Sequence, residues 1–238
     1  SGIQIENIKF SLENKLNKIT SITVSRKGSQ RVKDKWSKKI GNTSLILNKI
    51  LQLKQSRLVD TVCVGTNITE VEKICKEENV QHVWREEYYC DESRCSANEM
   101  IYDMCSKVEA DIIVWAHCTN PLVNAQTYDD AITKFLEKEK KGYDSLLSVN
   151  ILQEHLWTTD MFPMNYNPKA KRHVLAKQLP KLYKQDGAIF IQRKIDFLKN
   201  SYFFGDKPFL FLLEEKQSKD INTEMDLKIA NLFKEKDV

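Results

Sequence analysis

Residues 19–39 read ITSITVSRKGSQRVKDKWSKK, and this stretch decides the fold that we predict. Its first six residues form an apolar and β-branched run, which is typical of a buried β-strand. Residues 25–39 then carry seven lysines or arginines among fifteen residues. Residues 44–55 are amphipathic and predict a helix. The order of strand, basic loop and helix favours an α/β protein that binds an anion at the loop.

The residue types of this loop suit an anionic ligand. Gly28 lets the backbone approach a ligand closely, and Ser29 offers a hydroxyl. Arg26, Arg31 and Lys35 supply positive charge, and the N-terminus of the following helix adds a partial charge of the same sign. The alternative is a solvated basic loop without a ligand. The loop is neither a Walker A motif nor a G-x-G-x-x-G motif, because it lacks the glycine spacing of both.

Composition excludes several classes of protein. A chain of 238 residues is long enough for one large α/β domain or at most two small ones. The net charge of +4 is mild, so we expect no nucleic acid partner. No apolar run approaches the ~20 residues of a membrane span, so we expect no membrane partner. We see no signal peptide and expect a cytoplasmic protein.

The cysteines carry no metal-binding or redox spacing. They lie scattered, without a C-x-x-C pair, and several fall within apolar strand or helix patterns. We therefore favour buried free thiols in a reducing cytosol over disulfides or zinc, and we predict no structural metal cage. The six positions are Cys63, Cys75, Cys90, Cys95, Cys105 and Cys118.

Strands and helices alternate along the chain from residue 19. The predicted strands are residues 59–65, 80–84, 111–117, 145–149, 187–192 and 209–213, and the predicted helices are residues 70–78, 96–108, 127–140 and 224–234. Apolar strands that alternate with amphipathic helices predict a mostly parallel sheet with both faces covered. The predicted fold is a Rossmann-like, three-layer α/β/α domain over residues 19–238. Ligands of such sheets lie beyond the carboxyl ends of the strands, where the basic loop falls.

Two segments depart from this alternation. Residues 153–184 are rich in Pro, Asn, Tyr and Lys and predict an extended arm outside the core, for which an ordinary surface excursion is the alternative. Residues 1–18 form an N-terminal leader with apolar residues at helical spacing. A short amphipathic helix and a loose segment both fit this leader.

The basic loop resembles a known family. RKGSQRVKDK, residues 26–35, is similar to the signature A-R-x-G-S-K-R-x-x-x-K-N of sugar cytidylyltransferases, the group of CMP-sialic acid and CMP-KDO synthetases. In that family the loop wraps the triphosphate of CTP. The resemblance implies that Arg26 and Lys35 bind the triphosphate and serve catalysis. Gln30 and Trp36 depart from the usual Lys and Asn. The implied nucleotide-binding set is Arg26, Gly28, Ser29, Gln30, Lys35, Trp36 and Arg85.

Two further segments resemble the nucleotide site of the same family. GTN at residues 65–67 matches S-T-D, with Asn67 in place of the acidic residue. REEYYCD at residues 85–91 looks like R-P-x-E-L-A-x-D, which borders the base. A guanidinium can donate two hydrogen bonds to a carbonyl edge, so Arg85 is a candidate cytosine reader. The alternative is a surface arginine paired with Glu86 or Glu87.

The acceptor side of the resemblance rests on two segments. AHCTNPL at residues 116–122 matches Q-P-T-S-P-L, which faces the acceptor sugar, and His117 stands where Gln is usual. A purely structural hydrogen bond is the alternative role for His117. KLYKQDGAIF at residues 181–190 resembles F-R-x-N-G-A-I-Y, with Lys184 and Asp186 as replacements. The resemblance implies acceptor binding by His117, Thr119 and Lys184.

A magnesium site is implied at residues 219–224, KDINTE, which match I-D-I-D-T-E. Asp220 and Asn222 stand at the two metal-binding positions. Residues two apart on an extended segment point to the same side, and Mg²⁺ prefers oxygen ligands together with water and phosphate. The alternative is that Asp220 and Asn222 cap the last helix, although Thr223 would serve better as its cap.

Taken together, the resemblance implies a CTP-dependent nucleotidyltransferase that joins CMP to an acidic, nonulosonic-acid-like sugar or a related acceptor and releases pyrophosphate. It also implies Mg²⁺ as cofactor, a homodimer formed through the arm, and a place in nucleotide-sugar biosynthesis for cell-surface polysaccharide. Two alternatives remain. One is a nucleotide-binding regulator that has lost turnover, suggested by Gln30, Asn67 and Asn222. The other is a structural dimer module of a larger glycan-biosynthesis enzyme.

Overall fold

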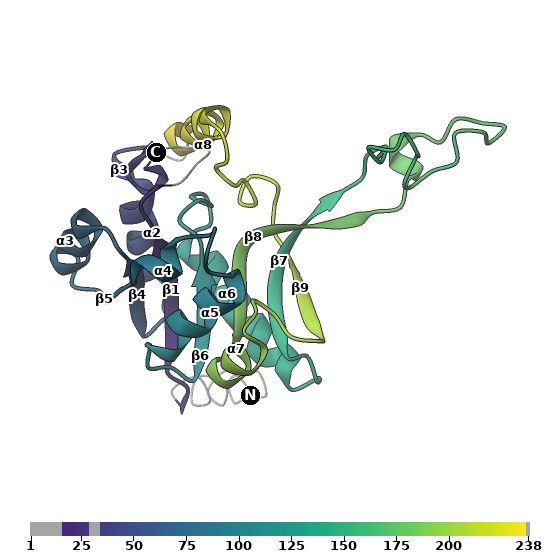
Figure 1. Ribbon diagram of the computed structural model, residues 1–238. Helices are drawn as coiled ribbons and strands as arrows, with labels where there is room; N and C mark the ends of the chain where they lie inside the picture. Colours follow the sequence, from purple (N-terminus) through teal and green to yellow (C-terminus); the bar gives the residue numbers. More distant parts are fainter. Residues whose placement is uncertain (1–15, 29–33, 237–238) are drawn as a thin grey trace, which may run out of the picture.

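A mostly parallel sheet runs through the centre of the molecule (Figure 1). The computed structural model describes residues 16–28 and 34–236, and in these residues seven strands form the sheet. In sheet order they are β5 (Gln81–Trp84), β4 (Thr61–Thr66), β1 (Ile19–Ser25), β6 (Ile112–Ala116), β8 (Leu182–Arg193), β7 (Ser145–Leu152) and β9 (Pro208–Leu212). Within this sheet, only the described pairs that involve β8 are antiparallel. The predicted mostly parallel sheet is confirmed.

Helices cover both faces of this sheet, which confirms the three predicted layers. On one face lie α2 (Leu45–Lys54), α3 (Thr69–Glu77) and α6 (Ala125–Glu139). On the other lie α5 (Ala97–Ser106) and α7 (Lys194–Asn200). Alternate residues of β6 pack into the hydrophobic cores on the two faces of the sheet. Ile112 and Val114 pack on the first face, and Ile113 and Trp115 pack on the second.

The residues of β1 explain its central place in the sheet. It pairs with β4 on one side and with β6 on the other, both in parallel. Two of its buried polar residues have backbone partners: the hydroxyl of Thr20 donates to the carbonyl of Glu109, and that of Thr23 donates to the carbonyl of Ala116. A strand buried on both faces therefore tolerates hydroxyl residues among its isoleucines.

Side-chain caps fix where the long helices begin. Ser44 caps α2, Asn124 caps α6, and Ser96 forms a capping box with Glu99 at the start of α5. The predicted helices agree with the observed ones within two residues at these starts. Two short helices were not predicted, α4 (Glu87–Cys90) and α7, because four and seven residues are too few to show a helical period.

The last helix, α8 (Glu224–Lys236), packs over a small second sheet near the site. That sheet pairs β2 (Lys39–Ile40) with β3 (Thr43–Ser44). Ile40 and Leu122 contact the apolar face of α8, so this helix bridges the chain after the basic loop and the chain after β6. The described residues also include two 3-10 turns, η1 (Lys35–Ser37) and η2 (Ala176–Gln178).

The predicted arm projects from the body of the molecule (Figure 1). Its base is a continuation of the sheet, since β7 and β8 pair as far as Leu152 and Leu182. The strand predicted to begin at residue 187 thus begins five residues earlier, and the first four added residues are exposed and show no alternation of apolar and polar side chains. The far end is held by its own contacts, among them the His155 ring against Tyr166 and His173.

Two further predictions concern the chain as a whole. All six cysteines are buried and free, as predicted. None of the described helices combines the length and the apolar character that a bilayer crossing requires. The predicted leader falls largely at residues 1–15, which lie outside the described residues.

Candidate active site

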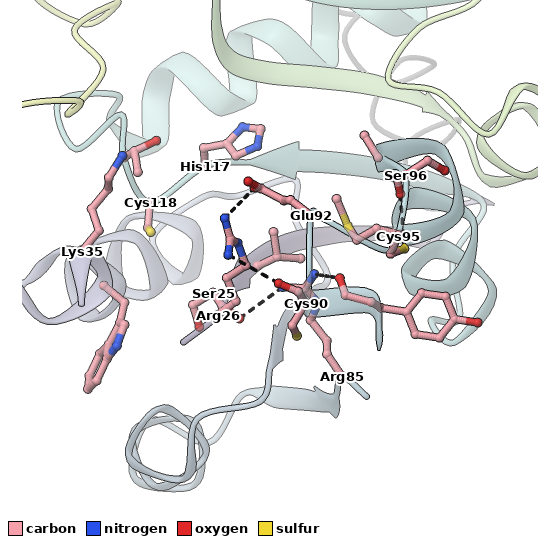
Figure 2. A pocket seen from close by; sticks show the side chains of 16 residues that line it. Ser25, Arg26, Lys35, Arg85, Cys90, Glu92, Cys95, Ser96, His117 and Cys118 are labelled. Carbon is pink, nitrogen blue, oxygen red and sulfur yellow. Dashed lines mark hydrogen bonds and ion pairs between the residues drawn. The ribbon is translucent and has the colours of Figure 1, made fainter. Parts of the chain in front are cut away.

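A pocket of about 570 Å³ opens at the carboxyl ends of β1 and β6 (Figure 2). Its walls come from these strand ends, from η1, from Arg85 after β5, and from the chain around α4 and the start of α5. This is the edge of the sheet where the basic loop was predicted to bind a ligand. Six predicted site residues line it together, namely Arg26, Lys35, Trp36, Arg85, His117 and Thr119.

Arg26 reaches the pocket from the end of β1. Its guanidinium donates to the backbone carbonyl of Cys90 at 3.4 Å and forms an ion pair with Glu92 at 2.6 Å (Figure 2). Lys35 comes to the same pocket from η1. Two cations therefore face a cavity large enough for a nucleotide, and one of them is held by a carboxylate of the opposite wall.

The described part of the basic loop has the predicted turn. Gly28 has a φ of +77°, a backbone conformation that favours glycine. The side-chain carbonyl of buried Asn67 accepts a hydrogen bond of 3.1 Å from the backbone of Lys27, so the end of β4 anchors the loop. The predicted ligand contacts of Ser29 and Gln30, and the charge of Arg31, lie outside the described residues.

Arg85 is buried, with 3% of its surface exposed. It donates to the backbone carbonyls of Ser25 at 3.2 Å and of Tyr89 at 2.8 Å, and thereby joins the end of β1 to α4. Burial lowers its pKa from the ordinary arginine value. The alternative of an exposed arginine paired with Glu86 or Glu87 is therefore wrong. A guanidinium has five donors, so Arg85 keeps donors for a ligand, and base recognition stays a prediction.

His117 uses its two ring nitrogens differently. Nδ1 lies 2.6 Å from the carbonyl oxygen of Gly187, and since a carbonyl only accepts, Nδ1 carries the proton and donates it. Burial lowers the pKa of His117, so the ring is neutral at pH 7 and Nε2 is an acceptor. The ring also packs against Phe190 and Phe203. His117 therefore makes the structural hydrogen bond through Nδ1, and Nε2 stays available to a ligand.

The segment that carries Asp220 is docked at the end of β6. The backbone of Ile221 donates to the carbonyl of Thr119 at 2.8 Å. Asn222 donates from its side chain to one carboxylate oxygen of Asp220 at 2.7 Å, so the two side chains lie on the same side as predicted. The other oxygen of Asp220 is buried and has no hydrogen-bond partner among the described residues.

The capping alternative for this segment is wrong. Thr223 caps α8, since its hydroxyl accepts from the backbone of Asp226 at 3.1 Å and the carboxylate of Asp226 accepts in return from the backbone of Thr223 at 2.8 Å. Asp220 takes no part in this cap. Asp220 and Asn222 do not line the pocket itself. The oxygen of Asp220 that has no partner among the described residues, with the amide of Asn222 beside it, fits the oxygen donor set that Mg²⁺ prefers.

Lys184 is not brought to the pocket. It pairs with Asn150 at the base of the arm and is exposed, and it does not line the cavity. Its neighbour Asp186 is instead buried, where its carboxylate accepts from Ser148 and from the backbone of Ala188. Desolvation raises the pKa of Asp186.

Two charged residues were missed, one that lines the pocket and one that lies beneath the end of β6. Glu92 gave no signal, because its role depends on the fold that brings it to Arg26. For Lys49 the sequence did contain a signal, because this lysine stands within the apolar pattern of the predicted helix 44–55, between Ile46 and Leu53. The structure buries it fully beneath the end of β6.

Comparison with known proteins agrees with this geometry. The family model described as cytidylyltransferase matches residues 20–236. Post-translational flagellin modification protein B of Campylobacter coli is 22% identical over 233 residues, which cover 94% of this chain and 98% of the relative. CMP-N,N'-diacetyllegionaminic acid synthase of Campylobacter jejuni subsp. jejuni serotype O:2 is 22% identical over 224 residues, which cover 88% of this chain and 92% of the relative.

A solved structure extends the likeness to the fold. CMP:2-keto-3-deoxy-manno-octonic acid synthetase, complexed with CTP, superposes with a TM-score of 0.65 at 13% identity and covers 93% of this chain and 100% of its own. The match of the family model over nearly the whole described sheet confirms the resemblance that began at the basic loop. The chain belongs to the cytidylyltransferase family.

Proposed function

We propose that this protein is a CTP-dependent cytidylyltransferase that joins CMP to an acidic sugar of the nonulosonic-acid kind and releases pyrophosphate. One observation carries the proposal: a single pocket at the carboxyl ends of the strands gathers Arg26, Lys35, Arg85 and His117. Relatives named as synthases of CMP-linked sugar acids support the acceptor class.

The residues of the pocket suit an in-line displacement. In this reaction an acceptor hydroxyl attacks the α-phosphorus of CTP, and the bond to the leaving pyrophosphate breaks. Arg26 and Lys35 would bind the triphosphate and stabilise the charge that develops on the leaving group. Arg85 would border the base. The acceptor would lie at Thr119 and His117, whose Nε2 can accept a hydrogen bond from a hydroxyl.

We assign the magnesium site to Asp220 and Asn222. The support is the buried carboxylate oxygen of Asp220 that has no partner among the described residues, together with the position of this segment against the end of β6. When bound, Mg²⁺ would neutralise charge on the phosphate oxygens of the nucleotide. Asp220 and Asn222 would hold the metal ion, while Arg26 and Lys35 bind the phosphates of the same nucleotide.

We further infer a homodimer that uses the arm. Large apolar side chains are exposed along it, and such groups favour protein interfaces over solvent. An acceptor role for Lys184 would require a second copy, because Lys184 does not line the pocket of its own chain. The exposed residues are Trp157, Met161, Phe162, Met164, Leu175 and Tyr183. We place the enzyme in the cytoplasm, since its six free thiols suit a reducing compartment.

Pyrophosphate release tests the proposed reaction. The protein is incubated with Mg²⁺, with CTP, UTP, ATP or GTP, and with a panel of neutral sugars and 2-keto sugar acids. We expect release only with CTP and a sugar acid. Release with a different nucleotide, or with neutral sugars alone, would contradict the assignment. Tight CTP binding without release from any acceptor would favour the regulator that has lost turnover.

A further inference from the structure

Lys49 is a buried cation that the proposed reaction has not yet used. It lies on α2 with 0% of its surface exposed. Its ammonium donates to the backbone carbonyl of Asn120 at 2.9 Å and to the hydroxyl of Tyr128 at 2.6 Å. Both partners are neutral, and no carboxylate among the described residues pairs with it. Burying a charge in this way is costly, and an apolar side chain would fill the same space without that cost.

Asn120, whose carbonyl Lys49 holds, in turn contacts the segment that carries Asp220. Asn120 is itself buried, with 1% exposed. Its side-chain amide donates to the carbonyl of Lys219 at 3.3 Å, one residue before Asp220. The neighbouring residue Thr119 accepts the hydrogen bond from Ile221, one residue after Asp220. Asp220 is thus held on both sides by the two residues at the end of β6, and Lys49 holds that end from below.

The charge of Lys49 also acts on the pocket. Burial lowers the pKa of His117 and raises that of Cys118 to about 11, and the charge of Lys49 adds a smaller downward contribution to both residues, which line the cavity. Cys118 and Lys234 act on Lys49 in return, and burial lowers the pKa of Lys49 to about 7. Lys49 is therefore only partly protonated at pH 7, so its hydrogen bonds to Asn120 and Tyr128, more than its charge, tie it to the end of β6.

We propose that Lys49 is a positioning residue for the transfer reaction, which fixes the end of β6 and, through Asn120, the segment that carries Asp220. This role rests on the proposed function, because the residue that Lys49 positions, Asp220, is assigned to that reaction. The same helix offers a matched control. Asn48 donates to the carbonyl of Pro121 at 3.1 Å, and Gln52 donates to the same carbonyl at 2.8 Å, so Asn48→Ala removes a tether of this loop but leaves Asn120 held.

The kinetic test compares Lys49→Met with Asn48→Ala. We expect Lys49→Met to lower kcat for pyrophosphate release by about tenfold or more and to raise the half-saturating Mg²⁺ concentration, while the affinity for CTP changes by less than about twofold. Asn48→Ala should keep the Mg²⁺ dependence of the wild type. Unchanged kcat and Mg²⁺ dependence in Lys49→Met, or equal losses in both variants, would overturn the proposal.

The second readout does not depend on turnover. Hydrogen exchange of the peptide that contains the amide of Ile221 should be about tenfold faster in Lys49→Met than in the wild type, and unchanged in Asn48→Ala. Equal exchange in all three proteins would overturn the proposal. If the wild type releases no pyrophosphate from any acceptor, the proposed function fails, while this exchange still decides whether Lys49 holds the segment.

Asn120→Ala keeps the test decisive if Lys49→Met does not fold. This variant retains the backbone carbonyl that Lys49 uses and removes the side-chain amide, which donates to the carbonyl of Lys219 at 3.3 Å and to that of Asp186 at 3.5 Å. It should reproduce the higher Mg²⁺ requirement and the faster exchange at Ile221. If Lys49→Met folds, the double variant should lose little more than either single variant, because both act in one chain of contacts. An Asn120→Ala protein with wild-type Mg²⁺ dependence would contradict the role.

Discussion

The carboxylate of Glu92 lies 2.6 Å from the guanidinium of Arg26, across the pocket that we assign to the nucleotide (Figure 2). Glu92 is largely exposed and belongs to the segment between α4 and α5, whereas Arg26 follows β1. The guanidinium of Arg26, which we expect to bind the triphosphate, is therefore already paired with the carboxylate of Glu92. Nucleotide binding then has to displace Glu92 or to share Arg26 with it.

Glu92→Gln should strengthen CTP binding by about two- to fivefold. The substitution removes a negative charge that competes with the phosphates for Arg26, and an exposed ion pair is weak, which limits the gain. The gain should shrink as salt is added, because salt screens exposed charges. Calorimetric titration at two salt concentrations measures it. Glu87→Gln, which removes an exposed charge from α4, is the control, and an equal gain in both variants would contradict a specific competition.

Arg26→Ala and Lys35→Ala should each weaken CTP binding by about tenfold or more. Both side chains line the pocket, and charge-assisted hydrogen bonds to phosphate are among the stronger polar contacts. The thermal unfolding temperature should change little, because neither side chain is part of a core cluster. Titration with CTP checks the affinity. Wild-type affinity for CTP in both variants would contradict the assignment of the basic loop as the triphosphate-binding site.

Asp220→Ala should abolish turnover while CTP still binds through the basic loop. Asn222→Asp should lower the Mg²⁺ concentration needed for half-maximal activity, because a second carboxylate attracts Mg²⁺ more strongly than an amide. The Mg²⁺ dependence of pyrophosphate release measures both effects. Normal turnover in Asp220→Ala would show that this segment holds no metal.

Asp226→Asn is the matched control for these metal-site variants. Asp226 lies in the same stretch, where its carboxylate accepts from the backbones of Asn222 and Thr223 and caps α8, but its side chain is not one of the assigned metal ligands. Its replacement should destabilise the fold by roughly 0.5–2 kcal/mol, as measured by denaturant unfolding, and should keep the Mg²⁺ dependence of the wild type. A raised Mg²⁺ requirement in Asp226→Asn would mean that the position of α8, and not a metal ligand at Asp220, controls the activity.

Replacing residues 153–181, the part of the arm before β8, by a short Gly-Ser turn should convert the proposed dimer into a monomer. The arm exposes Met161 at 81% and Phe162 at 68%, which is unfavourable in solvent. Sedimentation velocity of the intact and shortened chains measures the change. An intact chain that sediments as a monomer at micromolar concentration would exclude the dimer.

Much of the fold could be predicted because its signals are local. The run at residues 19–24 is β-branched since β1 is buried on both faces, and Ser44 and Ser96 mark helix starts by capping them. The extension of β8 to Leu182 could not be predicted, because its outer residues face solvent and carry no apolar alternation. Helix α7 is too short to show a period.

Several residues of the site could be predicted from the sequence, whereas the contacts between them could not. Arg26, Lys35 and His117 were found from short motifs, and the fold brings them to one pocket. The proton on Nδ1 of His117 depends on Gly187, which lies 70 residues later in the chain. The pairing of Arg26 with Glu92 likewise depends on the folded positions of distant segments. Contacts of this kind follow from tertiary structure, and a single sequence does not carry them.

Mass spectrometry of the reaction product tests the proposed transfer most directly. The wild type, Mg²⁺, CTP and a nonulosonic acid are incubated beside a matched reaction with Arg26→Ala. We predict a product with the mass of CMP joined to the sugar acid, formed together with pyrophosphate and greatly reduced in the variant. Binding of CTP with no such product from any acidic sugar, or equal product from Arg26→Ala, would contradict the assignment.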